Sequence, residues 1–194
     1  MTIIAANHDP FFEDINNPWS VWWEEEVKRI HDLLWKWKVL DLGFWVWRHV
    51  KQLLDLDYDL TWVELSKIWY TRLQEELVNK KKCANLYLGD MFEFQFDKKY
   101  DCIFSNMTLQ YSDSEQKFAE MIAKMKKNTN IWGINYIKLP AHWMSLWFPF
   151  KILDLGALKY YYHDWEILFD KFETQKKEDG KLGVYVTIIA RKKS

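Results

Sequence analysis

A short apolar run that ends in an acid and a glycine constrains the fold of this chain more than any other stretch. Val39 to Leu42 is apolar except for Asp41, Gly43 follows, and residues 47–56 have a helical pattern. A strand that turns into a helix in this way is the first unit of a doubly wound α/β sheet. In such sheets the ligand crevice lies beyond the carboxyl ends of the strands. We therefore expect a ligand site just after Asp41.

The rest of the chain alternates apolar runs with amphipathic segments, as an α/β sheet requires. The predicted strands are 39–42, 57–65, 84–88, 100–106, 131–137, 172–175 and 182–190, and the predicted helices are 19–34, 47–56, a segment after Ser66 that ends near 79, a segment that contains 118–125, and 164–172. No repeat or linker divides the chain, so residues 1–194 are expected to form one domain. Residues 1–35 would be an N-terminal segment with a helix that packs over the site or only covers the sheet.

Asp41 and Gly43 also carry a resemblance to a known family. The class I S-adenosylmethionine (SAM)-dependent methyltransferases have an acid-x-Gly-x-Gly-x-Gly loop at this place. Asp41 and Gly43 match it, and the resemblance extends over about residues 20–192. It implies a Rossmann-like three-layer α/β sandwich, with a mostly parallel seven-stranded sheet and an antiparallel C-terminal strand. It also implies SAM as the cofactor and a small molecule as the methyl acceptor.

The resemblance assigns cofactor contacts to five residues. Glu64 follows Gly43 by about 20 residues, where the Rossmann-type fingerprint has an acid that accepts hydrogen bonds from ribose hydroxyls. By resemblance, Glu64 would hold the ribose of SAM, and Asp90 would accept from the adenine amino group. Asn106, at the end of the fourth strand, completes this set with Asp41 and Gly43. A turn aspartate or a helix cap is the alternative for Asp90.

Tryptophans stand where the cofactor loop of the family has glycine. Glycine lets the chain turn tightly and brings backbone N–H groups close to a ligand. Trp45 and Trp47 occupy the next two glycine positions, and Trp62 occupies a position where relatives commonly have a small residue. A non-glycine residue at positive φ costs about 1–2 kcal/mol. Because the chain has 13 tryptophans and 6 glycines, deliberate engineering of the site is one hypothesis.

Enzymes of this class need few catalytic groups, because placing the acceptor in line with the methyl group supplies much of the rate acceleration. A general base helps when the acceptor must lose a proton, and His142, Tyr111 and His163 are the candidates. Tyr111 lies in the segment that, by resemblance, faces the transferred methyl. A structural role is the alternative for each histidine. Residues 138–162 would form a lid or shape the acceptor pocket, with packing or dimerisation as the alternative.

Composition excludes several other classes of protein. A formal net charge of −1 gives no field that steers nucleic acid to the chain. A proline and two charged residues interrupt the aromatic stretch 143–162, which argues against a membrane span. Cys83 and Cys102 are predicted to be reduced thiols, and no residue spacing indicates a metal site. The N-terminus lacks a signal-peptide pattern, so a cytoplasmic location is expected.

Three hypotheses for function follow from these residues. In the first, the chain is a working small-molecule methyltransferase in which Glu64 and Asp90 hold SAM. In the second, it keeps the fold, but Trp45, Trp47 and Trp62 obstruct the SAM site. In the third, it is a non-catalytic scaffold whose aromatic residues bind a flat ligand or a protein partner. Micromolar binding represents about 8 kcal/mol, and losing several backbone contacts of about 1–3 kcal/mol each would remove most of it, which favours the second. The oligomeric state is left open.

Overall fold

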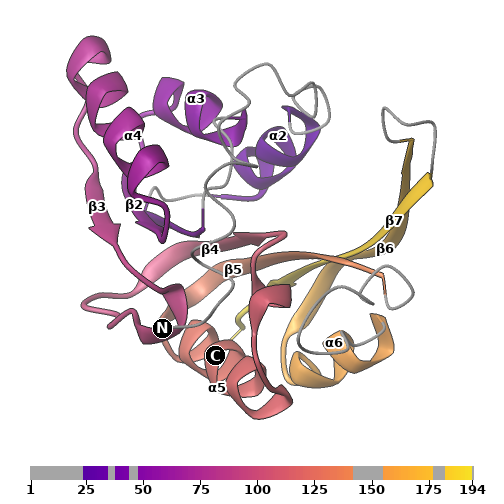
Figure 1. Ribbon diagram of the computed structural model, residues 1–194. Helices are drawn as coiled ribbons and strands as arrows, with labels where there is room; N and C mark the ends of the chain where they lie inside the picture. The colour runs from indigo at the N-terminus through magenta and orange to yellow at the C-terminus, as the bar shows by residue number, and fades with distance from the viewer. Residues whose placement is uncertain (1–23, 35–37, 44–47, 142–154, 177–181, 194) are drawn as a thin grey trace.

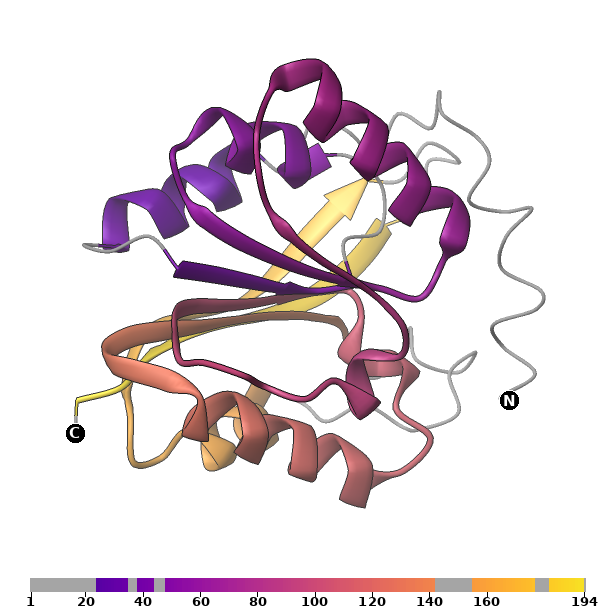
Figure 2. The same ribbon diagram turned by 90° about the vertical axis from the view of Figure 1, so that its left-hand side faces the viewer.

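The chain folds into three layers, with a twisted sheet between two sets of helices (Figures 1 and 2). The computed structural model describes residues 24–34, 38–43, 48–141, 155–176 and 182–193. The strands are β1 (Lys38–Leu42), β2 (Asp59–Glu64), β3 (Asn85–Leu88), β4 (Tyr100–Asn106), β5 (Thr129–Pro140), β6 (Glu166–Lys176) and β7 (Leu182–Arg191). The helices are α2 (Glu24–Leu33), α3 (Arg48–Asp55), α4 (Lys67–Lys80), α5 (Glu115–Lys127) and α6 (Leu155–Tyr161), with short 3-10 helices η2 (Met91–Glu93) and η3 (Leu109–Tyr111).

The seven strands form one sheet in the order β3-β2-β1-β4-β5-β7-β6. Strands β1 to β5 are parallel, and β7 runs antiparallel between β5 and β6. The predicted Rossmann-like sandwich with an antiparallel C-terminal strand is therefore confirmed. We call the edge where β1 to β5 end the carboxyl edge, and the edge where they begin the amino edge. The start of β6 and the end of β7 lie at the amino edge, because Glu166 pairs with Arg191 and Arg191 pairs with Ile134.

Apolar residues on the two faces of the sheet form two separate cores. One face packs against α2, α3 and α4, through residues such as Ile30, Leu53 and Leu73. The other packs against α5 and α6, through residues such as Phe118 and Leu158. Strand β4 is buried along its whole length, as a central strand covered on both faces must be. We call the side toward α2, α3 and α4 the α2 face.

Side chains in register across the parallel strands share a face. Asp41 pairs with Trp62 on β2 and with Phe104 on β4, and Phe104 pairs with Tyr136 on β5. Trp62, Phe104 and Tyr136 all belong to the core of the α2 face. Asp41 therefore lies in a row of aromatic side chains, one residue before the end of its strand.

The prediction of a helix over 164–172 is wrong. Strand β6 covers Glu166–Lys176 instead, and the last helix, α6, comes earlier, at Leu155–Tyr161. The error has a physical cause, because the pairing of β6 with β7 shifts register between Ile167 and Phe169. Such a bulge breaks the alternation of faces, and it leaves apolar residues at a spacing that resembles a helix.

Two predicted segments are described only in part. Helix α2 corresponds to the helix expected within residues 1–35, and residues 1–23 lie outside the described ranges. The predicted lid, residues 138–162, begins inside β5 and ends with α6, and residues 142–154 lie outside the described ranges. No helix in the described parts of the chain is long and apolar enough to cross a membrane.

Candidate cofactor and acceptor site

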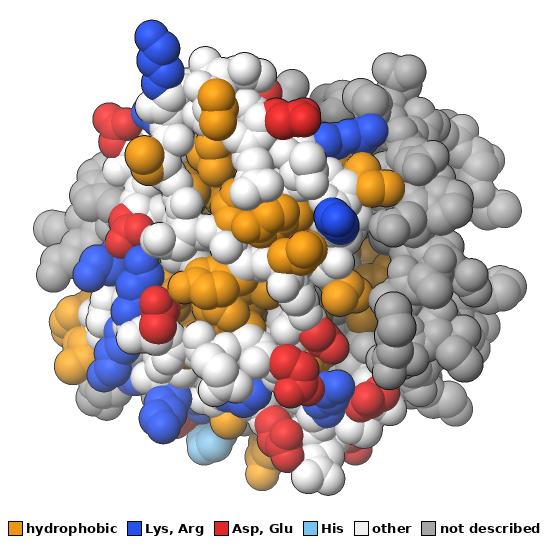
Figure 3. Space-filling model, turned by 60° about the vertical axis from the view of Figure 1, so that its left-hand side comes forward, with side chains coloured by type: hydrophobic (Ala, Val, Ile, Leu, Met, Phe, Trp, Pro, Cys, Tyr) orange, Lys and Arg blue, Asp and Glu red, His pale blue; other side chains and the backbone are white. Residues whose placement is uncertain are grey.

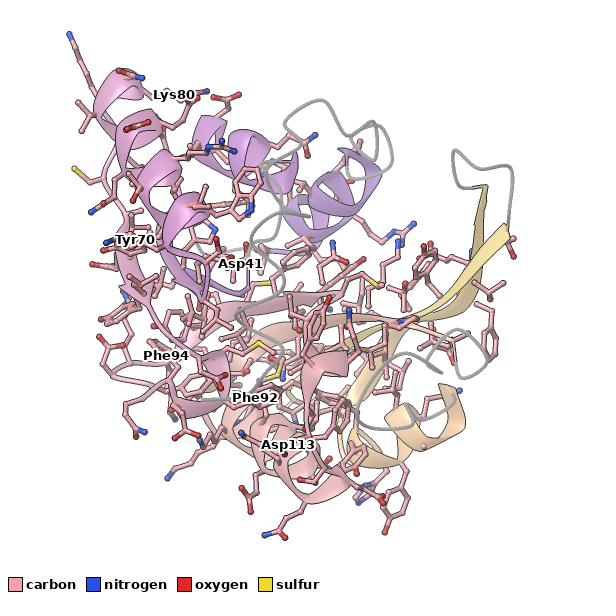
Figure 4. All side chains as sticks on the ribbon, in the orientation of Figure 1. Asp41, Tyr70, Lys80, Phe92, Phe94 and Asp113 are labelled. Carbon is pink, nitrogen blue, oxygen red and sulfur yellow. The ribbon has the colours of Figure 1, made fainter. Side chains whose placement is uncertain are left out.

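Asp41 lies at the carboxyl edge, beneath the helices of the α2 face (Figure 4), and forms a buried pair with Trp62 of the neighbouring strand. The indole Nε1 of Trp62 donates to Asp41 Oδ2 at 3.1 Å. Both side chains are fully buried, and Trp62 belongs to the same apolar core as Leu53 and Trp69. A carboxylate buried at this depth needs hydrogen-bond donors, and the indole supplies one. Of the three tryptophans expected to obstruct the SAM site, Trp62 is the one that the structure describes, and its side chain packs into the core.

Gly43 makes the turn that follows β1. Its φ is +79°, in the left-handed region that favours glycine, and its N–H donates to Val63 O at 2.9 Å. A Cβ on Gly43 would lie 2.6 Å from Thr108 Cγ2. This position therefore requires glycine both for its backbone conformation and for the space beside Thr108. The following residues, 44–47, with Trp45 and Trp47, lie outside the described ranges.

Glu64 ends β2 at the same edge. Its side chain is 8% exposed, and Oε1 accepts from the backbone N–H of Ser66 at 2.8 Å. Its backbone carbonyl accepts from the N–H of Gly89 at 2.8 Å, which ties the end of β2 to the end of β3. The carboxylate is therefore held in a fixed position at the edge, between the turn at Gly43 and the segment after β3.

Asp90 caps η2, as the structural alternative for this residue predicts. Its Oδ1 accepts from the N–H of Phe92 at 2.9 Å, and the residue is half-buried. Apolar side chains are exposed nearby, at Leu65, Tyr87 and Leu88. Figure 3 shows hydrophobic side chains gathered on this side of the molecule. An apolar surface beside a carboxylate is suited to a flat ring that carries an N–H donor.

Asn106 ends β4 and is 3% exposed. The next residue, Met107, has a left-handed φ of 57°, and its N–H donates to Lys138 O at 2.9 Å. Gln110 is also buried, and its Nε2 donates to Met107 O at 2.5 Å. Sequence reasoning missed Gln110, because a glutamine in a short connection gives no periodic signal. Hydrogen bonds to both the N–H and the carbonyl of Met107 therefore hold the left-handed turn after Asn106.

Lys138 is a second residue that sequence reasoning missed. It is 1% exposed and pairs with Asn106 on β4 and Thr187 on β7. Its Nζ lies 3.7 Å from Glu173 Oε2, which accepts from Thr187 Oγ1 at 2.5 Å. Arg29 Nη1 of α2 lies 3.8 Å from Glu173 Oε1. A lysine inside an apolar strand was a usable signal, since buried lysines are almost always paired.

The three candidate bases have different positions. Tyr111 belongs to η3, just after β4, and burial raises the pKa of its hydroxyl. His163 is exposed after α6, where its Nδ1 lies 2.7 Å from Tyr160 O. It precedes the start of β6 by three residues and so lies toward the amino edge, opposite Asp41 and Glu64. His142 lies outside the described ranges.

The structure thus brings together most of the residues that the resemblance assigns. Asp41, Gly43, Glu64, Asp90 and Asn106 all lie at the carboxyl ends of β1 to β4, and His163 does not. The residues present fit SAM at its ribose end, because the fixed carboxylate of Glu64 lies at the same edge as the left-handed glycine turn after β1. Within the described ranges, no group of histidine, cysteine and acidic residues suits a metal ion.

Comparison with known proteins identifies the family. The family model described as tellurite resistance protein TehB matches residues 5–181. This chain belongs to the TehB family. TehB from Haemophilus influenzae superposes with a TM-score of 0.77 and 26% identity, over 87% of this chain and 62% of that one. The chain therefore spans less than two thirds of the length of that relative. No curated protein sequence matches this chain.

Other solved structures share the fold of this chain. The N-methyltransferase NodS from Bradyrhizobium japonicum WM9, in complex with S-adenosylhomocysteine (SAH), has a TM-score of 0.73 and 14% identity, over 98% of this chain and 95% of that one. The 1,6-didemethyltoxoflavin-N1-methyltransferase of Burkholderia thailandensis, with SAH bound, has a TM-score of 0.72 and 15% identity, over 98% of this chain and 88% of that one. The resemblance in fold to the class I SAM-dependent methyltransferases is confirmed, and both of these solved structures hold SAH, the demethylated form of the cofactor which that resemblance implies.

Proposed function

We propose that this chain is a SAM-dependent methyltransferase that acts on a small molecule, with SAM binding weakened by Trp45 and Trp47. The observation that carries the proposal is the fixed carboxylate of Glu64 beside the left-handed turn at Gly43. Trp62 supports it too, because its indole packs into the core and donates to Asp41. Two of the three tryptophans therefore remain as the obstruction, and both stand at glycine positions of the family loop.

Residues at the cofactor end would each have one task. Glu64 would accept hydrogen bonds from the ribose hydroxyls, because one of its oxygens is already oriented by Ser66. Gly43 leaves room for backbone N–H groups to approach the ligand. Asp90 would accept from the adenine amino group while it caps η2. When bound, SAM supplies a methyl group on a positively charged sulfur.

Residues at the acceptor end would orient the acceptor. Tyr111 ends η3, the short helix that follows β4. Because burial raises the pKa of Tyr111, its hydroxyl stays protonated at neutral pH and would donate a hydrogen bond rather than act as a base. His142 remains the proposed base for acceptors that must lose a proton, and residues 138–162 remain the proposed lid or acceptor segment. His163 is left out of the proposal because of its position toward the amino edge.

The proposed acceptor is a small molecule rather than a nucleic acid, because the formal net charge is −1. NodS and the toxoflavin enzyme are named for small-molecule or N-methyl transfer, which supports this class. Tellurite is the first acceptor to test, since the TehB family is named for resistance to it. The proposed site of action is the cytoplasm.

The test is isothermal titration of the chain with SAM and SAH, beside the Trp45→Gly, Trp47→Gly double variant. We expect weak binding by the unmodified chain and binding at least about 10-fold tighter by the double variant, as recovery of one or two backbone contacts would give. Glu64→Gln in the double variant should weaken binding by about 10-fold, because a charge-assisted bond becomes a neutral one. Glu75→Gln, an exposed glutamate of α4, is the matched control.

Two outcomes would overturn the proposal. Failure of the folded double variant to bind either ligand would leave the non-catalytic scaffold as the better description, which binding of planar dyes would then test. Equal effects of Glu64→Gln and Glu75→Gln would remove Glu64 from the site. Transfer of a labelled methyl group from SAM to tellurite, followed by radiometric detection, would then separate a working enzyme from a protein that only binds SAM.

A further inference from the structure

A chain of two buried hydroxyls links the end of β4 to the end of β1. Thr108 Oγ1 donates to the backbone carbonyl of Leu42 at 2.7 Å. Ser105 Oγ lies 2.8 Å from Thr108 Oγ1. Because the hydroxyl proton of Thr108 points to Leu42, Ser105 donates and Thr108 accepts. Both side chains are buried, so the chain is shielded from water.

The same threonine fills the space that Gly43 leaves open. A Cβ on Gly43 would come within 2.6 Å of Thr108 Cγ2 and 3.1 Å of Thr108 Cβ. Thr108 therefore contacts the turn in two ways, since its methyl packs against Gly43 and its hydroxyl holds the carbonyl of Leu42. The N–H of Gly43 is held from the other side by Val63 O. The backbone between β1 and the loop is thus fixed by both neighbouring strands.

This arrangement has no explanation in strand pairing alone. The ladder between β1 and β4 ends at Asp41 and Phe104, so Leu42 lies beyond it. A carbonyl at the end of a strand is normally satisfied by water or by the next strand. Here a side chain from 66 positions later in the sequence satisfies it.

We propose that Thr108 is a positioning residue for the cofactor loop, which holds the turn at Gly43 in its left-handed conformation. The inference rests on the proposed function for its effect on SAM, because the loop matters for catalysis only if SAM binds there. Its structural part does not depend on SAM. Loss of the hydroxyl frees the carbonyl of Leu42, so the turn at Gly43 samples other conformations.

Three substitutions separate the hydroxyl from the bulk of the side chain. Thr108→Val keeps the shape and removes the donor, and Thr108→Ser keeps the donor and removes the methyl group. Thr129→Val is the matched control, because Thr129 is also buried and its Oγ1 lies 2.7 Å from two acceptors at the amino edge, Met125 O and Asn135 Oδ1. A general loss of stability would affect Thr108→Val and Thr129→Val alike.

The first measurement is amide hydrogen exchange at Gly43, which needs no ligand. Thr108→Val should raise the exchange rate at Gly43 by about 10-fold, as loss of one buried hydrogen bond allows. Thr108→Ser should stay within about 3-fold of the unmodified chain, because it keeps that bond. Thr129→Val should leave exchange at Gly43 unchanged. Equal exchange at Gly43 in Thr108→Val and in the unmodified chain would overturn the proposal.

The second measurement is titration with SAH. Thr108→Val should weaken SAH binding by about 10-fold, with Thr108→Ser restoring most of it and Thr129→Val having no effect. Equal losses in Thr108→Val and Thr129→Val would overturn the positioning role. Absence of SAH binding in the unmodified chain and in its Trp45→Gly, Trp47→Gly variant would reject the proposed function instead, and hydrogen exchange would still decide the role of Thr108.

A milder pair of variants covers the case in which Thr108→Val does not fold. Ser105→Ala removes the donor to Thr108 and leaves the bond to Leu42, so exchange at Gly43 should rise by about 3-fold. Ser112→Ala is its control, because Ser112 is buried and donates to Ser114 O at 2.8 Å, away from the loop. The same exchange rate at Gly43 in these two variants would overturn the proposal.

Discussion

The two edges of the sheet treat their carboxylates differently. At the carboxyl edge, Asp41, Glu64 and Asp90 accept from neutral donors, which are an indole N–H and two backbone N–H groups. At the amino edge, three exposed carboxylates accept from lysine ammonium groups, and the pairs are Asp57 with Lys82, Asp59 with Lys98, and Asp164 with Lys126. The buried carboxylate of Asp101 at this edge instead accepts from neutral donors, the N–H of Lys38 and Nδ2 of Asn130. The first arrangement fixes a carboxylate and keeps its charge available to a ligand. The second neutralises charge at the surface.

Exposure follows the same division. The side chain of Asp57 is 92% exposed, whereas Asp41 is fully buried and Glu64 is 8% exposed. Exposed ion pairs contribute little to stability and are screened by salt. Fixed dipoles in a buried site need no reorganisation when a ligand binds. The comparison teaches that neutral donors orient the buried carboxylates of Asp41 and Glu64, whereas lysines pair with the exposed carboxylates of the amino edge.

The largest expected effect comes from Gly43→Ala at the carboxyl edge. The substitution forces a side chain to a φ of +79° and brings its Cβ within 2.6 Å of Thr108 Cγ2. Backbone strain and overpacking together should lower the free energy of unfolding by about 2–4 kcal/mol. Urea denaturation measures it. Gly89→Ala is the control, because a Cβ there meets nothing within 4 Å. An equal loss of unfolding free energy in the two variants would contradict a special role for the Gly43 turn.

Trp62→Phe should have the next largest effect. It removes the indole donor to Asp41 and leaves a buried carboxylate with one hydrogen bond fewer, at a cost of about 1–3 kcal/mol. Thermal unfolding of Trp62→Phe, Asp41→Asn and the double variant gives the coupling between the two side chains. We expect a coupling above about 0.5 kcal/mol. Additive losses would mean that Asp41 does not depend on the indole.

Tyr111→Phe tests the carboxyl edge through the pH dependence of the methyl-transfer rate. Because burial raises the pKa of Tyr111 above its ordinary value near 10, the hydroxyl stays protonated and the methyl-transfer rate should not depend on its ionisation between about pH 7 and 9. Loss of one hydrogen bond to the acceptor should lower the rate by up to about 10-fold across this range. The pH–rate profiles of both proteins check this. An ionisation near pH 8 that disappears in Tyr111→Phe would contradict it.

Lys82→Gln at the amino edge should have the smallest effect. The hydrogen bond and the charge of Lys82 lower the pKa of Asp57, so the pair stabilises the fold above pH 4 or so and loses this contribution as the pH falls further. The melting temperature of Lys82→Gln should therefore fall slightly less between about pH 5 and 2 than that of the unmodified chain. Lys99→Gln, at another exposed lysine near this edge, is the control. The difference should vanish in about 0.5 M salt, and one that persists would point to a buried pair.

The fold could be predicted because its strands are apolar runs bounded by turns. The prediction of 100–106 matches β4, and that of 57–65 contains β2. The failure at 164–172 shows the limit of such patterns. Strand β6 carries a register shift, and only its pairing with β7 determines that the segment is extended.

Part of the site could be predicted for a similar reason. Asp41, Gly43 and Glu64 lie at ends of strands that are themselves predictable, and their spacing follows from one βαβ unit. Thr108 and Lys138 could not be assigned a role, because their partners lie on other elements. Thr108 contacts Leu42 from 66 positions away, and Lys138 lies near Glu173 on a different strand.

The sequence by itself determined the order of strands and helices as far as β5, the acid and glycine at the end of β1, and the acid at the end of β2, because these depend on local periodicity and short spacing. The tertiary structure alone decided three matters. It decided that Trp62 points into the core toward Asp41, that Thr108 holds the turn at Gly43, and that His163 lies toward the edge opposite the site. Each depends on contacts between residues distant in sequence, which arise only when separate strands pack side by side.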